Sequence, residues 1–433
     1  MTTGPTPAPS PSPRSTSQAS WLSSRLSAAK EHVEGTVGLL DRPLTSYYLL
    51  VGTTALLTGL GLLMVLSASS VTSYASTGSS FTLFEKQAMW VGAGIPLMWL
   101  AARLPARIYR VCAYPLLLLA IGGLALVLVP GVGETVNGAT RWVDVGPFQI
   151  QPSEPAKLGL ILWGADLLAR KQRLGLLREW RHLLVPLMPG TGFVVLLVMM
   201  GDDLGTTLIL LTVFLALLWV VGAPARLFTG MFGFVVLVVC ILVVVEPYRL
   251  KRLTTFLDPF AHLYGSGWQS VQGIYALASG GFWGVGLGAS REKWDYLPHA
   301  QTDFIFAIIG EELGLMGTLV VLALFGLLGY AGIRVARRNK DPFIRLAATG
   351  ATAWLVVQAL VNIGAVIGVL PITGIPLPLV SYGGSALLPT LIAIGMLLSF
   401  AKREPGAGRA LAARGPGAAV RAMGWLGFRS RGR

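Results

Sequence analysis

Long apolar segments recur along this chain, and they restrict its fold more than any other feature. Each runs for about 20 residues, the length an α-helix needs to cross about 30 Å of hydrocarbon. Inside a bilayer the backbone must satisfy its own hydrogen bonds, so such segments cross as helices. With 54% hydrophobic and only 12% charged residues, the chain has far more apolar surface than a soluble domain hides. The sequence therefore predicts an all-α polytopic membrane protein.

Ten spans are predicted, and the charges between them orient the chain. The spans cover about 47–66, 87–104, 111–129, 153–168, 184–200, 204–221, 227–245, 302–335, 346–370 and 386–400. Dense Arg and Lys clusters follow spans two, four and eight, and such clusters mark cytoplasmic loops. Both termini are then cytoplasmic, and one large extracytoplasmic loop, about 246–302, separates spans seven and eight.

Three regions are expected. Residues 1–45, rich in Pro, Ser and Thr, are predicted to be a disordered cytoplasmic tail, 46–401 the ten-span membrane domain, and 402–433 a basic disordered cytoplasmic tail. The last region supplies half of the net charge of +14, and this placement argues against a nucleic-acid partner. The basic tail either touches anionic membrane lipids or is simply solvated, and the solvated tail is favoured. Two cysteines in apolar spans and four scattered histidines predict neither a disulfide framework nor a thiolate or histidine metal site.

Three carboxylates stand out at the start of the eighth span. Asp303 lies at its outer boundary, and Glu311 and Glu312 lie about two helical turns deeper. An ionisable group at membrane depth costs roughly 2.5 to 3.5 kcal/mol, so such groups are functional candidates. The alternative is structural: Thr302 or Asp303 caps the helix by accepting hydrogen bonds from its first free N–H groups.

The large outer loop contains more basic residues than outer loops usually do. Arg249, Lys251 and Arg252 cluster where span seven ends, which indicates either an anionic ligand or pairing with acids of the same loop. Five glycines between 280 and 288 allow close approach of backbone to backbone or to a ligand. They match no phosphate-binding fingerprint.

Several motifs together resemble the SEDS family of cell-wall synthases, which includes the FtsW division proteins and the RodA elongation proteins. The resemblance covers about 45–402, and the first motif is more similar to FtsW. The motifs are Met64–Ser70, Gly138–Trp142 leading to Gln151–Lys157, Asp203–Thr207, Leu297–Gly314 and Pro378–Ser385.

The resemblance implies a peptidoglycan glycosyltransferase that polymerises lipid II at the outer face of the cytoplasmic membrane, at the division septum. Its implied partners are a class B, FtsI-like penicillin-binding protein and other divisome proteins. The family's catalytic acid falls on Asp303, and its loop carboxylate falls on Asp295. Gln301 stands where the family usually has His, and Asp202 where a Pro is common.

The chemistry of these residues agrees with that activity. Joining sugars requires a base for the acceptor hydroxyl and groups that stabilise the departing pyrophosphate. Asp303 is the candidate base, with a pKa raised by burial or by Glu311, Glu312 or Asp295. Lys157 either binds the pyrophosphate or pairs with Glu154, and Asp203 either orients a cation or caps span six. The candidate substrate-binding residues are Glu154, Lys157, Asp203, Arg249, Arg252, Gln272, Asp295 and Ser381.

Direct attack by one activated acceptor predicts inversion at the anomeric centre. A divalent cation, Mg²⁺ or Mn²⁺, with the pyrophosphate is a further expectation, although no metal-ligand spacing in the sequence supports it. Two other functions compete: a lipid II flippase, which needs charges along a path through both leaflets, and a non-catalytic divisome scaffold. Assaying polymerisation of labelled lipid II separates the three.

Overall fold

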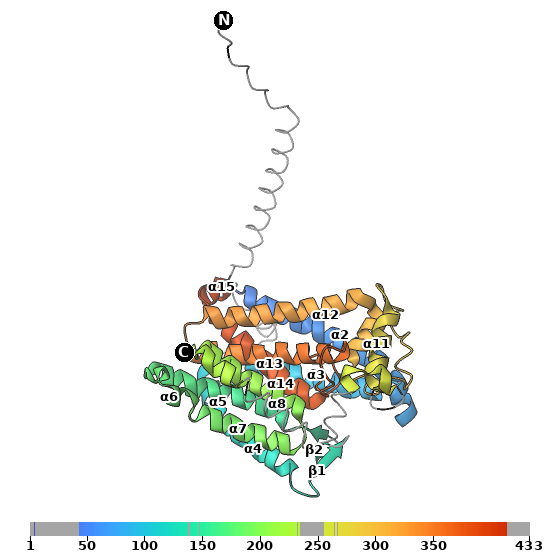
Figure 1. Ribbon diagram of the computed structural model, residues 1–433. Helices are drawn as coiled ribbons and strands as arrows, with labels where there is room; N and C mark the ends of the chain where they lie inside the picture. Colours follow the sequence, from blue (N-terminus) through green and yellow to red (C-terminus); the bar gives the residue numbers. More distant parts are fainter. Residues whose placement is uncertain are drawn as a thin grey trace, which may run out of the picture.

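The computed structural model describes Gly4 and residues 43–136, 139–146, 148–231, 233, 255–263, 265 and 267–413. Long helices lie side by side in one bundle, with a small sheet at one end (Figure 1). The elements are α2 (Thr45–Thr77), α3 (Thr82–Ala101), α4 (Ala106–Val127), β1 (Gly133–Val136), β2 (Ala139–Val145), β3 (Phe148–Ile150), α5 (Ser153–Arg173), η1 (Leu176–Arg178), α6 (Trp180–Leu184), α7 (Leu187–Met200), α8 (Leu204–Val220), η2 (Phe260–His262), α11 (Trp268–Gly280), α12 (Ile305–Arg338), α13 (Pro342–Val366), α14 (Gly384–Ala401) and α15 (Ala407–Ala413).

Nine of the ten predicted spans correspond to helices in the described residues. Six helical segments, which include α2, α4, α12, α13 and α14, are long and apolar enough to cross a membrane. The sixth combines α6 and α7, and α8 is a shorter apolar helix. Helices α3 and α5 have 20 and 21 residues. Most of the seventh predicted span, 227–245, lies outside the described residues. The all-α, multi-pass class is confirmed.

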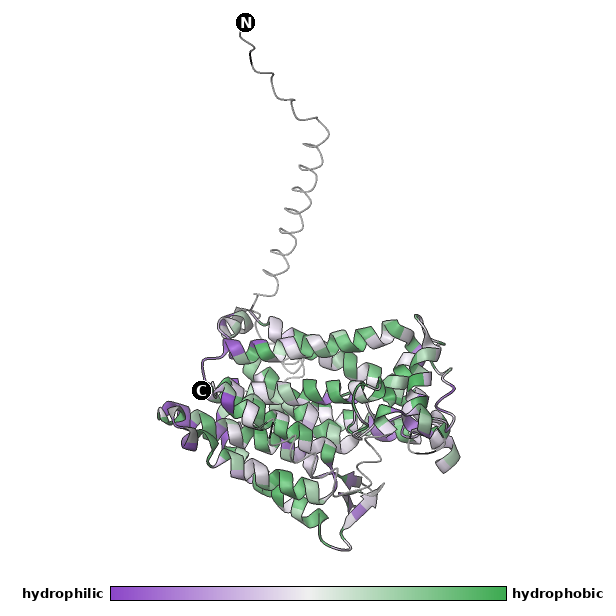
Figure 2. Ribbon diagram, viewed as in Figure 1, coloured by the Kyte–Doolittle hydropathy of each residue, from purple (hydrophilic) through white to green (hydrophobic). Residues whose placement is uncertain are grey.

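Helices α13 and α14 form the centre of the bundle. In each, 67% of the most apolar stretch is buried, against 28% for α4 and for the segment that contains α7. Helix α13 packs against α5, α8 and α12, and α14 packs against α3. Apolar residues dominate the middle of the helices, and polar residues gather towards both ends (Figure 2). Polar side chains on α5 and α13 are therefore enclosed by other helices.

The two ends of the bundle differ in charge. Helices α6 and α15 lie at one end, together with the basic residues that terminate α5, α12 and α14, which we call the basic end (Figure 1). These residues are Arg170, Lys171, Arg173, Arg337, Arg338 and Lys402. The sheet and α11 lie at the opposite end, which we call the site end (Figure 1).

The segment between α4 and α5 contains a three-stranded sheet that the sequence analysis did not predict. Strand β2 pairs antiparallel with β1 on one side and with β3 on the other. A Cβ on Gly133 would lie 2.0 Å from the carbonyl oxygen of Val127, the last residue of α4. Only glycine permits this approach, so the sheet begins directly against the end of α4.

Helix α12 is broken at Gly314, where φ is +67°. The surrounding loop replaces the lost helical hydrogen bonds. Val285 and Gly286 donate their backbone N–H groups to the carbonyls of Glu311 and Glu312, at 2.9 and 3.1 Å. In return, the N–H groups of residues 315 and 316 donate to the carbonyls of residues 281 and 282. This exchange satisfies backbone groups that a break at membrane depth would otherwise leave unpaired.

Two of the five loop glycines, Gly280 and Gly284, are explained by the same contact. A Cβ on Gly284 would lie 2.2 Å from the Glu312 carbonyl oxygen, and one on Gly280 would lie 1.9 Å from the Gly310 oxygen. Of the two alternatives that the sequence left open for the glycines, close approach of backbone to backbone is therefore the one seen here.

The predicted C-terminal tail begins in ordered structure. Helix α15 follows α14, and the Glu404 side chain is buried with carboxylate oxygens 3.9 Å from Arg334 and 3.8 Å from Arg338. The prediction of disorder from residue 402 is therefore wrong for 402–413. The rest of that tail, 414–433, and all of 1–42 except Gly4 lie outside the described residues.

Candidate functional site

Asp303 lies in the turn that precedes α12, at the site end of the bundle. The N-cap of α12 is Phe304, and no side chain caps this helix. The structural alternative, that Thr302 or Asp303 caps it, is therefore wrong. The Asp303 carboxylate is not used to satisfy helix N–H groups and remains available for another role.

Two buried polar side chains hold this turn against residues 371–383. The Asn362 amide of α13 donates to the backbone oxygens of both Asp303 and Ile375, at 2.8 Å each. The Ser381 hydroxyl donates to the Thr302 carbonyl at 2.6 Å. Asn362 and Ser381 are 2% and 5% exposed, so water does not compete for these bonds. The backbone that presents the acid is fixed from two sides.

Gly374 brings Asp303 and Arg141 together. A Cβ at this glycine would lie 3.7 Å from Oδ2 of Asp303 and 3.8 Å from both terminal nitrogens of Arg141. Gly374 has φ of +69°, a conformation that glycine adopts without strain. The acid from the α12 turn and the guanidinium from β2 therefore face the same small stretch of backbone.

The surroundings of Asp303 raise its pKa above the ordinary aspartate value. Burial is the main cause, and nearby Asp203 adds to it, whereas His299 and Arg141 lower the pKa. The neighbouring carboxylate is thus Asp203, and the expectation that Glu311, Glu312 or Asp295 supplies the like charge is wrong. A raised pKa makes the ionised carboxylate a stronger base.

Asp203 caps α8, which is one of the two roles that the sequence left open for it, and it also contacts Arg141, a cation that was not among the expected partners. Its side chain caps α8 by accepting from the Thr206 backbone N–H at 3.0 Å, and it also accepts from the Thr206 hydroxyl at 2.8 Å. Gln151 donates to it at 3.0 Å, and a terminal nitrogen of Arg141 lies 3.8 Å away. Asp203 is buried, with 3% of its surface exposed. It orients Arg141 from a fixed position.

A small pocket of about 10 Å³ lies next to Arg141 and Asp203. Its polar wall includes the Ser153 hydroxyl and the Nε of Arg141, two buried atoms without a hydrogen-bond partner among the described residues. Its apolar wall comes from α4, α7 and the segment after α4, with Leu124, Val127, Leu128, Leu197 and Val198. The pocket therefore combines a cationic, hydrogen-bonding end with an apolar side.

Lys157 of α5 belongs to a buried network of hydrogen bonds inside the bundle. Its Nζ donates to Glu154 at 2.8 Å and to Gln358 at 3.0 Å, and it lies 5.1 Å from the centre of the Trp354 ring. The Trp354 indole donates to the same Gln358 oxygen at 2.7 Å. Lys157 is 0% exposed and Glu154 is 2% exposed. Of the two alternatives for Lys157, the structure shows the pairing with Glu154.

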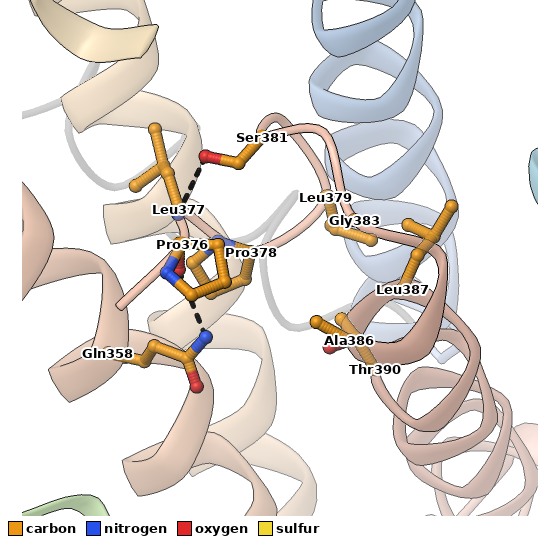
Figure 3. Close-up of a pocket in the computed structure, with 10 residues that line it drawn as sticks. All are labelled: Gln358, Pro376, Leu377, Pro378, Leu379, Ser381, Gly383, Ala386, Leu387 and Thr390. Atoms are coloured by element: carbon orange, nitrogen blue, oxygen red, sulfur yellow. Dashed lines mark hydrogen bonds between the residues drawn. The ribbon is translucent and has the colours of Figure 1, made fainter. Parts of the chain in front are cut away.

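Gln358 connects the buried network to the segment before α14. Its amide donates to the Pro376 carbonyl at 3.0 Å, and the Ser381 hydroxyl accepts from the Leu377 N–H at 2.8 Å (Figure 3). These residues and Thr390 line a small pocket of about 10 Å³ between α13 and α14. Ser381, a predicted substrate-binding residue, thus shapes the loop that supports the site.

Glu311 and Glu312 form a second cluster at the break in α12. Glu311 accepts from the Ser290 hydroxyl at 2.5 Å, and Glu312 accepts from the Ser67 hydroxyl at 2.6 Å. The Nζ of Lys293 lies 3.7 Å from the Glu312 carboxylate. These contacts fasten α2 and residues 288–293 to α12, which is a structural role separate from Asp303.

The remaining predicted site residues are dispersed or outside the described part. Gln272 is buried on α11, and Asp295 is exposed, with no hydrogen bond or ion pair to a described residue. Arg249 and Arg252, with the neighbouring Lys251, lie outside the described residues. Within the described chain, Arg141 is the arginine that approaches Gly374 together with the acid.

Sequence reasoning missed three residues of this site. Arg141 belongs to a quoted motif, but the short strands that bring it to Asp303 have no clear alternation. Asn362 and Gln358 are amides inside an apolar span, a signal as unusual there as a charge. Their spacing of four residues puts both on one face of α13, so they were findable as a pair.

The fold and the site define a polytopic helical membrane protein with an acid and an arginine facing each other at one end of the bundle. The model of the FtsW, RodA and SpoVE family, described as cell cycle protein, matches residues 47–405, so the chain belongs to this family.

Similarity to individual proteins agrees. A probable peptidoglycan glycosyltransferase FtsW from Mycobacterium tuberculosis is 45% identical over 376 residues, covering 86% of this chain and 71% of that protein. Stage V sporulation protein E from Bacillus subtilis is 39% identical over 82% of this chain and 96% of its own. The greater similarity to FtsW expected from Met64–Ser70 is in line with these identities.

Solved structures share the fold. A chain from a structure described as coordination of polymerization and crosslinking by a peptidoglycan synthase complex superposes with a TM-score of 0.69, at 32% identity. The rod shape determining protein RodA from Thermus thermophilus gives a TM-score of 0.61 at 30% identity. Each match covers 82% of this chain and 97% of the other.

Proposed function

We propose that this protein is a peptidoglycan glycosyltransferase that polymerises lipid II at the outer face of the cytoplasmic membrane. The observation that carries the proposal is the shared position of Asp303 and Arg141 against Gly374. The names of its relatives point to the same activity. The basic end is the cytoplasmic end by the positive-inside rule, which puts both termini in the cytoplasm and the site end outside.

Asp303 is the general base in this proposal. Its carboxylate takes the proton from the acceptor hydroxyl while the hydroxyl oxygen bonds to the anomeric carbon of the donor sugar. The bond from that carbon to the pyrophosphate oxygen breaks, and the electron pair leaves with undecaprenyl pyrophosphate. A single displacement of this kind inverts the anomeric centre.

Arg141 stabilises the negative charge that develops on the leaving group. Asp203 and the sheet hold the guanidinium in place before the reaction, so little reorganisation is needed. In this proposal Arg249 and Arg252 bind the pyrophosphate together with Arg141. Arg249 and Arg252 lie outside the described residues.

A divalent cation, Mg²⁺ or Mn²⁺, accompanies the pyrophosphate in this proposal. The described residues contain no group of three His, Cys, Asp or Glu side chains placed to hold a metal. In this proposal the cation is bound by the pyrophosphate oxygens of the substrate, which are natural ligands for Mg²⁺.

The proposed setting is septal cell-wall synthesis with a class B penicillin-binding protein and other divisome proteins. The protein chain superposed above comes from a peptidoglycan synthase complex, which supports a partner of this class. The partner contributes transpeptidation, so polymerisation must be tested with that activity removed.

The test is polymerisation of labelled lipid II by the purified chain, with its partner synthase made transpeptidase-inactive. We expect glycan strands that lengthen with time and are cleaved by a muramidase. A flippase or a scaffold yields no polymer in detergent, where there are no leaflets to cross. Absence of polymer from a folded chain that binds its partner would contradict the proposal.

A further inference from the structure

The loop that fills the break in α12 exposes apolar side chains that the candidate site does not use. Residues 282–287, which we call the apolar loop, expose Phe282 by 49%, Trp283 by 77%, Val285 by 46% and Leu287 by 63%. The whole stretch from 281 to 288 contains no charged or hydrogen-bonding side chain except the Trp283 indole. So much apolar exposure in one short segment indicates a contact surface.

The backbone of the apolar loop is fixed to α12. Its N–H groups at 285 and 286 and its carbonyl at 282 hydrogen-bond with α12 residues 311, 312 and 316. The glycines at 280, 284 and 314 bring the two backbones close enough for these bonds. The side chains are therefore held outward at one level of the bundle and do not fold back onto it.

Two helices independently place this level at the outer limit of the hydrocarbon. On α12, Gly314 lies about 20 residues, or about 30 Å, before Arg334 at the basic end. On α2, Tyr47 marks the basic end, because Lys402 lies over its ring. Ser67 lies about 20 residues after Tyr47 on the same helix. Ser67 and Glu312 are hydrogen-bonded, so the level derived from α2 and the level derived from α12 coincide along the bundle.

The apolar loop continues the lipid-facing surface of α12. Directly after the break, α12 exposes Leu315, Met316, Leu319 and Val320 between 39% and 54%. Because the loop bonds to residues 315 and 316, its side chains extend this exposed face by one level. Aromatic side chains are enriched at that depth, where the acyl chains meet the headgroups.

We propose that the apolar loop inserts into the outer leaflet, with Trp283 and Phe282 at the boundary between acyl chains and headgroups. The occupant of this surface is membrane lipid. The exposed Arg291 follows three residues after the glycine at 288 and faces the anionic headgroups. The insertion sets the height of the α12 break, and thereby of the turn that presents Asp303, relative to the membrane.

A fluorescent probe at residue 283 tests the insertion. Trp283→Cys is made in a chain with Cys112→Ser and Cys240→Ser, labelled with bimane and reconstituted into phosphatidylglycerol and phosphatidylethanolamine nanodiscs. Lipids with a spin label at acyl carbon 5 or 12 quench the probe by depth, and iodide quenches it from water. We expect strong loss of emission with the carbon-5 label, less with the carbon-12 label, and little with iodide.

Two matched positions calibrate the result. Val320→Cys lies on the exposed face of α12 below the break and should be quenched by both spin-labelled lipids. Asp144→Cys is exposed on β2 and should be quenched by iodide alone. If residue 283 behaves like residue 144, the loop stands in water and the proposal is overturned. Protection from both kinds of quencher would also overturn it, because a second copy of the chain would then cover the loop.

Discussion

Replacing Asp303 by asparagine lowers the polymerisation rate by about 10²–10⁴-fold, the usual contribution of a general base. The amide has the size and shape of the carboxylate but cannot accept the proton of the acceptor hydroxyl. The contacts that hold the turn remain, because Asn362 and Ser381 bind backbone oxygens of residues 302 and 303. The measurement is the initial rate of glycan-strand formation from labelled lipid II.

An exchange on β2 serves as the matched control. Asp144 is an exposed aspartate on the same strand as Arg141, and Asp144→Asn removes one negative charge at the site end without touching the acid turn. We expect it to keep the native rate, and both variants to unfold at the native temperature. A fully active, folded Asp303→Asn chain would rule out this residue as the base.

Replacing Lys157 by methionine destabilises the protein by about 3–5 kcal/mol, the usual cost of removing one partner of a buried ion pair. The Glu154 carboxylate would lose its only cation in the network while remaining 2% exposed. One of its oxygens already has no hydrogen-bond partner among the described residues, so little compensation is at hand. Unfolding in mixed micelles, followed by tryptophan fluorescence, measures the loss.

The double variant Glu154→Gln with Lys157→Met separates charge from packing. It removes both charges, so no ion is left without a partner in the bundle, and most of the lost stability should return. If the double variant is as unstable as Lys157→Met alone, the penalty comes from packing against Trp354 and the ion pair is not its cause.

The sequence was sufficient for features that depend on composition along the chain. Apolar segment lengths predicted the helices, and the boundary between the spans at 184–200 and 204–221 agrees with the ends of α7 and α8. Asp303 was found because a charge at the boundary of an apolar span is costly and therefore rare. Each of these signals is local, and no tertiary contact is needed to read it.

Features that depend on distant contacts were not predictable in this way. Arg141 and Asp303 are far apart in sequence, and only the sheet and Gly374 bring them together. Whether Lys157 pairs with Glu154 or binds a ligand was not predictable, because it depends on contacts with another helix. Gln358 of α13 accepts a hydrogen bond from Lys157. The break in α12, against which the loop glycines at 280 and 284 pack, occurs at Gly314. A single glycine in an apolar segment does not predict that a helix breaks there.

The pH dependence of polymerisation by the native chain and by Arg141→Gln tests the acid and arginine site most directly. The base must be ionised, so the rate falls as pH decreases through the pKa of Asp303. Burial raises that pKa, so the native inflection should lie above the ordinary aspartate value of about 3.9. Arg141 lowers the same pKa, and its removal should therefore move the inflection to still higher pH. An inflection that stays in place in Arg141→Gln, or that persists unchanged in the residual activity of Asp303→Asn, would contradict the account.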